Sequence, residues 1–263
     1  MAKIFTLVNQ KGGVGKTTTA INLGAYLGYF GQRVLLVDLD PQANATSSLG
    51  IDKHTVKNGT YEVIIGSMPV SPQILHNPRL KISLLPSSPA LAGADVELID
   101  LDNRETRLRE SLKSVHDRYD YILIDCPPSL SILTINGLMA ASSGIIIPVQ
   151  CEYLALEGLG QLTNTIQRVQ NSLYPELVVR GVVLTMYDGR TRLAMDVVNE
   201  VRRFFPSQVY QTIIPRSVRL AEAPSYGFPI SIYAPDSSAA KAYSCLAREI
   251  LVQDGIIIPD IEE

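Results

Sequence analysis

The sequence predicts an α/β fold built on a mostly parallel β-sheet, and three observations support this prediction. Short, continuous apolar runs alternate along the 263 residues with longer amphipathic segments, which is the pattern of linked βαβ units. Two of these runs end in an aspartate, and acids in that position face the crevice in which open α/β sheets bind ligands. A glycine-rich stretch separates the first apolar run from the first amphipathic segment. The sequence therefore predicts a ligand site along the carboxyl edge of the sheet.

The predicted strands are unbroken apolar runs, because parallel strands are buried on both faces. The predicted helices carry apolar side chains every three to four residues. Residues 52–78 mix glycine, proline and short apolar pieces, and we expect a short helical insertion there; residues 96–115 are predicted to be mostly helical. Strands are predicted at residues 4–8, 33–38, 82–85, 121–125, 144–149, 177–185 and 209–214, and further helices at 20–30, near Leu133, and at 156–173, 192–205 and 238–251.

The glycine-rich stretch, Val8 to Thr19, has the features of a phosphate-binding loop between a strand and a helix. Glycines there let the backbone N–H groups of residues 12–17 converge on an anion, and the helix N-terminus adds a favourable dipole. Lys16 would place a positive charge at the β- and γ-phosphates, and Thr17 would offer a hydroxyl to Mg²⁺. A glycine-rich turn without a ligand is the alternative, which Gly-Lys-Thr between a strand and a helix disfavours. The predicted nucleotide-binding residues of the loop are Lys11, Gly12, Gly13, Val14, Gly15, Lys16, Thr17 and Thr18.

Two aspartates at predicted strand ends are candidates for holding Mg²⁺. Asp38 closes the run at 33–38, and Asp125 closes the run at 121–125. Four apolar residues followed by an aspartate are what a Walker B site needs, because the rigid strand holds the carboxylate beside the hydrated metal. Asp125 could instead cap the helix near Leu133, and its local sequence does not separate the two alternatives. The phosphate-binding loop upstream favours the metal site.

The composition is that of an ordinary soluble globular protein, with 46% hydrophobic and 19% charged residues. A chain of this length could form one α/β domain or two small ones, but no repeat, low-complexity tract or linker divides it. We therefore expect residues 1–263 to form a single P-loop ATPase domain. Neither a signal peptide nor an apolar run of about 18 residues is present, which predicts a cytoplasmic protein without a membrane span.

The three cysteines, Cys126, Cys151 and Cys245, are odd in number and far apart. They suggest neither a disulfide framework nor a metal site, and we expect small buried side chains in a reducing cytoplasm. The three histidines are equally scattered and suggest no metal either.

Positive charge is concentrated in one segment of a chain whose net charge is −3. Residues 180–219 carry seven arginines against three acidic residues. Within this segment, the helix predicted at 192–205 would direct Leu193 and Phe204, together with three valines, toward the core and its arginines toward solvent. Such a concentration of arginine is typical of phosphate contact, and a solvated helix face with salt-bridged arginines is the alternative.

Several motifs resemble those of the ParA/Soj chromosome and plasmid partition ATPases, which belong to the deviant Walker A group of P-loop NTPases. Gln10 replaces the usual first glycine of the loop, and a further lysine follows at Lys11, as in the pattern K-G-G-x-G-K-[ST] of that group. The resemblance covers nearly the whole chain. It is carried by residues 10–18, 38–44, 124–128, 152–158 and 214–225, of which the last two segments point to ParA/Soj proteins rather than to their cousins.

The resemblance implies a doubly wound, mostly parallel sheet with helices on both faces and a slow ATP hydrolase that uses ATP and Mg²⁺. It also implies that ATP is enclosed between the two subunits of a homodimer, with Lys11 reaching the ATP of its partner. Asp40 would orient the attacking water. Thr17 would bind Mg²⁺ directly, and Asp38 and Asp125 would support the metal mainly through waters.

Phosphoryl transfer needs an in-line water and charge neutralisation rather than covalent help, and Lys16 with Lys11 in trans would supply positive charge. By the same resemblance, Pro215 and Ser217 would lie beside the adenine and the ribose. Ser217 stands where the family more often has asparagine.

The resemblance also implies a role in segregating a chromosome or plasmid. The ATP-bound dimer would bind DNA of any sequence on the nucleoid, and a ParB-type centromere-binding protein would stimulate hydrolysis and release it. Family arginines that contact DNA match Arg190 and Arg219. Phe228 stands where relatives often carry lysine, and Asp236 begins a stretch that is usually basic. We therefore expect a DNA footprint smaller than the family's.

Three other function classes are open at this stage. A MinD-like membrane-positioning ATPase would need a basic amphipathic C-terminal helix, whereas residues 256–263 are short, proline-broken and acidic. An iron-protein-like electron donor would need cysteines that share an Fe–S cluster, and Cys126 has no second cysteine in a matching context. A nucleotide-gated scaffold without significant hydrolysis is disfavoured by Asp40, and a turnover assay separates it from an ATPase.

Overall fold

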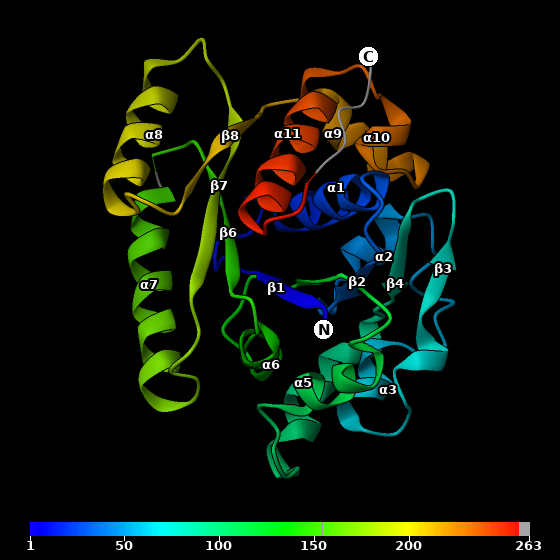
Figure 1. Ribbon diagram of the computed structural model, residues 1–263. Coiled ribbons are helices and arrows are strands. Elements are labelled where there is room, and N and C mark those ends of the chain that lie inside the picture. The colour runs from blue at the N-terminus through cyan, green and yellow to red at the C-terminus, as the bar shows by residue number, and fades with distance from the viewer. Residues whose placement is uncertain (154, 258–263) are drawn as a thin grey trace.

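Eight strands form one sheet with helices on both faces in the computed structural model, which describes residues 1–153 and 155–257 (Figure 1). The strand order β3-β4-β2-β5-β1-β6-β7-β8 confirms the doubly wound sheet, because the chain adds strands on one side of β1 first and, from β6, on the other. Only β3 runs antiparallel to its neighbour within these residues. The strands are β1 Lys3–Leu7, β2 Val34–Asp38, β3 Leu75–Asn77, β4 Ile82–Leu85, β5 Tyr121–Asp125, β6 Ile145–Gln150, β7 Val179–Tyr187 and β8 Val209–Pro215.

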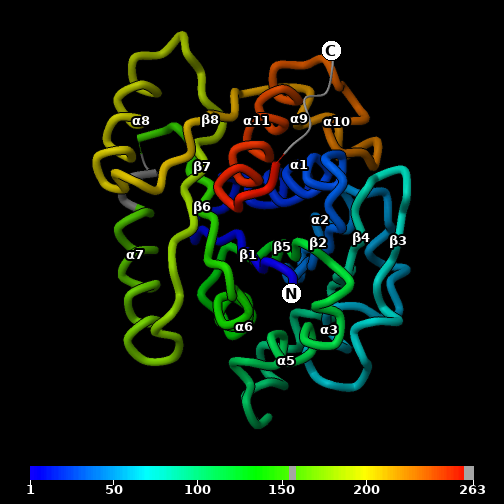
Figure 2. Tube along the Cα trace, viewed as in Figure 1, coloured from blue at the N-terminus to red at the C-terminus, as the bar shows by residue number. Residues whose placement is uncertain are grey.

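Neighbouring residues along a strand pack against helices on opposite faces of the sheet. Leu123 of β5 packs in the core under α1 and α11, which lie side by side above the sheet in Figure 2, whereas Ile122 and Ile124 pack on the opposite face. In β6, Ile146 joins the first layer and Ile147 packs against α7 and α8. Burial on both faces explains the unbroken apolar runs. The helices are α1 Lys16–Tyr29, α2 Asn44–Ser48, α3 Thr60–Ile65, α4 Ala94–Glu97, α5 Arg107–Leu112, α6 Ile132–Ala140, α7 Ala155–Ser172, α8 Arg192–Phe204, α9 Val218–Glu222, α10 Ile230–Tyr233 and α11 Ser238–Gln253.

A buried carboxylate fastens the end of α11 to the amino edge of the sheet. Asp254 is 2.7 Å from the Lys3 ammonium and 2.9 Å from the Arg180 guanidinium, and its Oδ2 accepts a hydrogen bond from the Tyr121 hydroxyl at 2.7 Å. These three partners come from β1, β7 and β5, so one side chain joins three strands to the last helix. Arg180, one of the seven arginines of the basic segment, therefore has a structural role.

All seven predicted strands are confirmed, with ends that shift by one or two residues. The insertion at 52–78 contains the predicted short helix, α3, but it also contains β3, which the sequence analysis missed. All three residues of β3 are exposed, so the strand lacks the apolar run by which the other strands were found.

The segment predicted to be mostly helical, 96–115, forms short α- and 3₁₀-helices rather than one continuous helix. The chain forms α4 and α5 with turns between them, and Asn103 lies in the left-handed region at φ 53°. A helix cannot continue through that conformation, which asparagine tolerates better than most residues. The break lets Leu98 and Leu108 both reach the core.

The orientation predicted for two residues of α8 is also wrong. Leu193 and Phe204 are 47% and 53% exposed, and the buried face consists of Ala194, Val197, Val198 and Val201. These four positions follow the helical repeat. The prediction failed because it assigned large apolar side chains to the buried face and left out the small Ala194, which lies on that face.

The prediction of buried cysteines holds for Cys126 and Cys151, but Cys245 on α11 is exposed. No helix in the described parts of the chain is long and apolar enough to cross a membrane.

Candidate nucleotide and magnesium site

Sheet register brings the predicted site residues to one edge. Leu7 at the end of β1 pairs with Asp125 at the end of β5, and Asp125 pairs with Asp38 at the end of β2. The phosphate-binding loop follows β1 directly. Its neighbours in space are therefore the two acidic strand ends, although they lie far along the chain.

The loop has the backbone of an anion site. Gly13 and Gly15 lie at φ 74° and 90°, a region that residues with a Cβ rarely adopt. Gly15 is the N-cap of α1 and no side chain caps the helix. The first N–H groups of α1 therefore have no intrahelical partner and are available to phosphate oxygens.

Lys16 folds back over this loop. Its ammonium donates a hydrogen bond to the carbonyl of Lys11 at 3.1 Å, and only 7% of the residue is exposed. Burial lowers the pKa of Lys16, and the neighbouring carboxyl groups of Asp125 and Asp40 oppose that shift. The ammonium thus lies at the floor of the loop, beside the first N–H groups of α1, where both could contact a bound phosphate.

Hydrogen bonds to β6, β7 and α7 hold the loop in place. Asn9 donates to the carbonyl of Pro148 at 2.8 Å and accepts from the backbone N–H of Lys11 at 3.0 Å. Thr185 donates to the carbonyl of Val14 at 2.8 Å. Gln10, at the position of the usual first glycine, donates to the hydroxyl of Thr165 on α7 at 3.0 Å. Glutamine in place of glycine at position 10 therefore connects the loop to α7.

Asp38 is a buried carboxylate with three hydrogen-bond donors. Its Oδ2 accepts from the backbone N–H and the hydroxyl of Thr46 at 2.8 and 2.7 Å, and its Oδ1 accepts from the N–H of Asp40 at 3.2 Å. The Thr46 hydroxyl accepts in turn from the N–H of Ser87, whose own hydroxyl donates to the carbonyl of Asp40 at 2.9 Å. Burial raises the pKa of Asp38 to about 6 against the effect of these donors.

Asp125 is buried and neither of its carboxylate oxygens has a hydrogen-bond partner among the described residues. Burial, reinforced by the charge of Asp38, raises its pKa to about 8. The Thr17 hydroxyl lies near enough to lower this pKa without forming a hydrogen bond of ordinary geometry, and Lys16 also lowers it. Ser131 caps α6, which excludes the alternative in which Asp125 is the cap of that helix.

This donor set fits Mg²⁺. The metal takes oxygen ligands and keeps several waters, and the two unpartnered oxygens of Asp125 lie beside a carboxylate and a hydroxyl. No three His, Cys, Asp or Glu residues in the described parts of the chain form a metal cluster. Phosphate oxygens and waters would therefore complete the coordination sphere.

A cavity of about 410 Å³ extends from the loop toward the end of β8. Gly15 and Thr18 line one end, and Pro215 and Ser217 line the other. The structure thus brings both residues expected near the base to the phosphate-binding loop. Met186, also in the lining, lies at φ 53° where the pairing of β7 with β8 is irregular, so strained backbone shapes this wall.

The two candidate DNA-binding arginines follow neighbouring strands at the same edge, and both are ion-paired. Arg190 lies 2.6 Å from Asp188, and Arg219 lies 3.0 Å from Glu222. Both guanidinium groups remain largely exposed. The hydrogen bonds that Asp188 accepts from Arg190 lower the pKa of Asp188 to about 2.

Sequence reasoning missed Thr46 and Ser87. Thr46 follows Asp38 and Asp40 by only a few residues in the sequence, and this proximity was the one signal that could have pointed to it. Ser87 follows β4 with no motif around it, and only the folded sheet brings it to Asp40.

Comparisons with known proteins show the family to which the chain is related. A family model described as an AAA domain matches residues 2–179. The sporulation initiation inhibitor protein Soj of Bacillus subtilis (strain 168) is 52% identical over 250 residues, which cover 95% of this chain and 98% of that protein. The chromosome-partitioning ATPase Soj of Treponema pallidum (strain Nichols) is 50% identical over 255 residues, covering 97% and 99%. The structure of cobyrinic acid a,c-diamide synthase from Mycobacterium smegmatis, with bound ATP analogue and magnesium, has a TM-score of 0.85 at 36% identity and covers 100% of both chains.

Proposed function

Because the chain belongs to the ParA/Soj family of chromosome-partitioning ATPases, we propose that ATP and Mg²⁺ bind in the crevice around Lys16 and Asp125 and that ATP closes a DNA-binding homodimer. The observation that carries this proposal is a buried lysine in a glycine loop beside a buried carboxylate without hydrogen-bond partners. The Asp125 oxygens and the first N–H groups of α1 have no hydrogen-bond partner among the described side chains, and the metal and the triphosphate would supply these partners.

Each part of the nucleotide has a matching surface. The N–H groups at the start of α1 and the Lys16 ammonium face the phosphates, and the cavity between Thr18 and Pro215 is large and apolar enough for adenine. Ser217 offers a hydroxyl near the ribose end. Thr17 would bind Mg²⁺ directly, with Asp38 and Asp125 acting mainly through waters.

Bound Mg²⁺ would neutralise charge on the β- and γ-phosphates. Asp40 orients the water that attacks the γ-phosphorus, because its carboxylate lies at the same edge and its Oδ1 is steadied by the N–H of Gln42 at 2.9 Å. Lys16 stabilises the charge that develops on the phosphoryl oxygens, and Lys11 of a second subunit adds to it.

The homodimer would form across the edge that carries the site. Leu130, Tyr153 and Val218 follow the carboxyl ends of β5, β6 and β8, and they are 48%, 71% and 73% exposed. Large apolar side chains gathered around a charged crevice support an interaction face. Lys11 stands on the same edge, as a role in trans requires.

DNA binding would use the arginines after β7 and β8. The ion pairs of Arg190 and Arg219 are exposed, and solvent screens exposed pairs strongly, so a DNA phosphate could replace the carboxylate partner with little loss of stability. Two subunits closed together would present two such surfaces, and bivalent contact raises affinity steeply. The protein would then associate with the nucleoid only while ATP is bound, and a ParB-type partner would trigger hydrolysis and release.

Purified protein tests the proposal through ATP turnover measured alone, with random-sequence DNA, and with DNA plus a ParB-type protein. We expect slow basal turnover that the two additions stimulate together. Lys16→Ala should abolish nucleotide binding, whereas Asp40→Ala should stop turnover and keep MgATP bound. Unchanged ATP affinity of Lys16→Ala in calorimetry would refute the assigned site, and binding without any turnover would favour a nucleotide-gated scaffold.

DNA binding has its own test, a salt titration of ATP-bound Asp40→Ala protein on duplex DNA. Arg190→Ala and Arg219→Ala should each reduce the slope of log K against log salt by about one, as expected when one phosphate contact is lost. Slopes equal to that of the parent protein in both variants would show that these arginines form a solvated face.

A further inference from the structure

Ser87, the second residue after β4, is hydrogen-bonded to the segment that carries Asp38 and Asp40. Its hydroxyl donates to the carbonyl of Asp40 at 2.9 Å, and its backbone N–H donates to the Thr46 hydroxyl at 2.9 Å. The residue is fully buried. We propose that Ser87 is a positioning residue for ATP hydrolysis, a role that rests on the function proposed for Asp40. The serine hydroxyl fixes the turn from which the Asp40 carboxylate orients the attacking water.

The turn at residues 40–43 needs such a contact because its backbone is strained. The N–H of Ala43 donates to the Asp40 carbonyl at 2.8 Å and closes the turn, and Ala43 itself lies in the left-handed region at φ 51°. Alanine is disfavoured there, since its Cβ crowds a backbone carbonyl oxygen. Strained backbone persists only where the surrounding structure fixes it. The Ser87 hydroxyl does so from another strand, because it donates to the same carbonyl oxygen.

The direction of the Asp40 carboxylate depends on this turn. Its Oδ1 accepts from the N–H of Gln42 at 2.9 Å, which is the one hydrogen bond that the carboxylate makes within the described residues. Both the carboxylate and this donor therefore move when the turn moves. A displacement of about 1 Å at a reacting group can lower a rate by about 100-fold.

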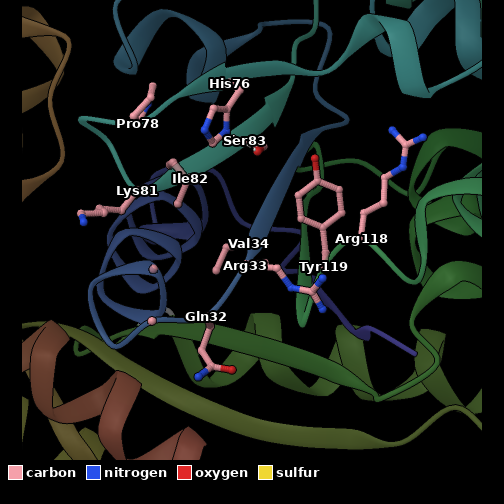
Figure 3. Close-up of a pocket in the computed structure, with 12 residues that line it drawn as sticks. Gln32, Arg33, Val34, His76, Pro78, Lys81, Ile82, Ser83, Arg118 and Tyr119 are labelled. Carbon is pink, nitrogen blue, oxygen red and sulfur yellow. Dashed lines mark hydrogen bonds between the residues drawn. The ribbon is translucent and has the colours of Figure 1, made fainter.

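β4 holds the serine in place at the side of this turn. Leu85, the last residue of β4, pairs with Val37 of β2, so Ser87 leaves the sheet beside the residues that follow β2. The strand is also anchored at its other end. There Ser83 lies beside His76 of β3 in the wall of a separate cavity, and Nδ1 of the histidine is 3.1 Å from the serine hydroxyl (Figure 3).

The two donors of Ser87 have different targets, and this difference can be tested. The hydroxyl reaches Asp40, whereas the N–H reaches Asp38 through the Thr46 hydroxyl, which donates to Asp38 at 2.7 Å. Alanine at position 87 removes the hydroxyl and keeps the N–H. The substitution should therefore disturb the orientation of water and leave the carboxylate on the metal side unchanged.

Steady-state ATP turnover and MgADP calorimetry of Ser87→Ala test the proposal. We expect kcat to fall about tenfold or more while KM, MgADP affinity and the Mg²⁺ concentration for half-maximal MgADP binding stay within about twofold of the parent. Ser88→Ala is the matched control, because Ser88 is also buried but takes no part in the side-chain hydrogen bonds of residues 38–46 within the described structure. All four quantities should stay within about twofold in Ser88→Ala.

Hydrogen exchange of the nucleotide-free protein gives a readout that does not depend on turnover. Peptides that contain residues 40–46 should exchange faster in Ser87→Ala, because the turn loses a contact to its carbonyl. Peptides from β1 and β5 should exchange as they do in the parent protein.

Any of four results would overturn the proposal. These are a kcat of Ser87→Ala within about twofold of the parent, an equal loss in Ser88→Ala, unchanged exchange at residues 40–46, and faster exchange throughout the chain, which would give Ser87 a general role in stability. A parallel loss of MgADP affinity would place Ser87 in nucleotide binding instead. Absence of turnover in the parent is a different outcome, since it would refute the proposed function itself and the role of Ser87 with it.

Discussion

Replacing Asp125 with asparagine should stabilise the nucleotide-free protein while it destroys magnesium-dependent binding. The carboxyl is fully buried, its oxygens have no hydrogen-bond partner in the described structure, and its pKa is raised from 3.8 to about 8. A raised pKa in the folded state means that the folded protein holds a proton that the unfolded chain has lost. The cost to folding is absent below about pH 4, grows between pH 4 and 8, and is constant above pH 8.

The size of the effect follows from that pKa. About four pKa units at 1.36 kcal/mol each set an upper bound of about 5 to 6 kcal/mol above pH 8. Relaxation around the site, water entry and the unsatisfied amide of asparagine reduce the gain, and we expect about 2 to 3 kcal/mol. Urea unfolding with a chelator present, at pH 5 and at pH 8.5, measures it. The gain should be several times larger at pH 8.5.

Asp38→Asn is the matched control, because Asp38 is equally buried but accepts three hydrogen bonds. The pKa of Asp38 is raised only to about 6, and asparagine weakens the hydrogen bonds that the ionised group accepts, so any gain at pH 8.5 should be clearly smaller than that of Asp125→Asn. MgADP should stabilise the parent protein by mass action and leave Asp125→Asn nearly unchanged. The reasoning is refuted if Asp125→Asn is less stable than the parent at pH 8.5, or if its gain is the same at both pH values.

Other substitutions test the site and the scaffold that supports it. Thr46→Val removes the hydroxyl that donates to Asp38 at 2.7 Å, and should raise the Mg²⁺ concentration for half-maximal MgADP binding about tenfold, whereas Thr46→Ser should restore it; equal titrations would show that the hydroxyl does not position the carboxylate. Asp254→Asn removes two ion pairs and should lower the free energy of unfolding by about 1 to 3 kcal/mol in urea titrations, with basal turnover retained below the transition. Gly137→Ala would put a Cβ 2.5 Å from the Cys126 sulfur, directly behind Asp125, and should cost about 1 to 3 kcal/mol of stability; a neutral result would mean that the helix shifts freely.

The local features of this protein were predictable from its sequence. A phosphate-binding loop needs contiguous residues, so Gly13, Gly15 and Lys16 could be assigned before their φ angles and contacts were known. The buried strands could also be predicted from the sequence, because a strand that is buried on both faces consists of an unbroken apolar run. The failures had local causes too: β3 has no buried face, the left-handed Asn103 interrupts a helical pattern, and the buried stripe of α8 passes through the small Ala194 rather than Leu193.

Only the tertiary structure decided how the acids differ. Asp38 and Asp125 end similar apolar runs and received similar roles, yet one accepts three hydrogen bonds and the other none in the described structure. Their environments depend on Thr46, which lies on a short helix, and on Ser87, which follows another strand. The sequence by itself determined the loop, the strands and the identity of the charged groups, since each is encoded in adjacent residues. Desolvation and hydrogen-bond partners depend on segments far apart in the chain, and those come together only when the sheet is assembled.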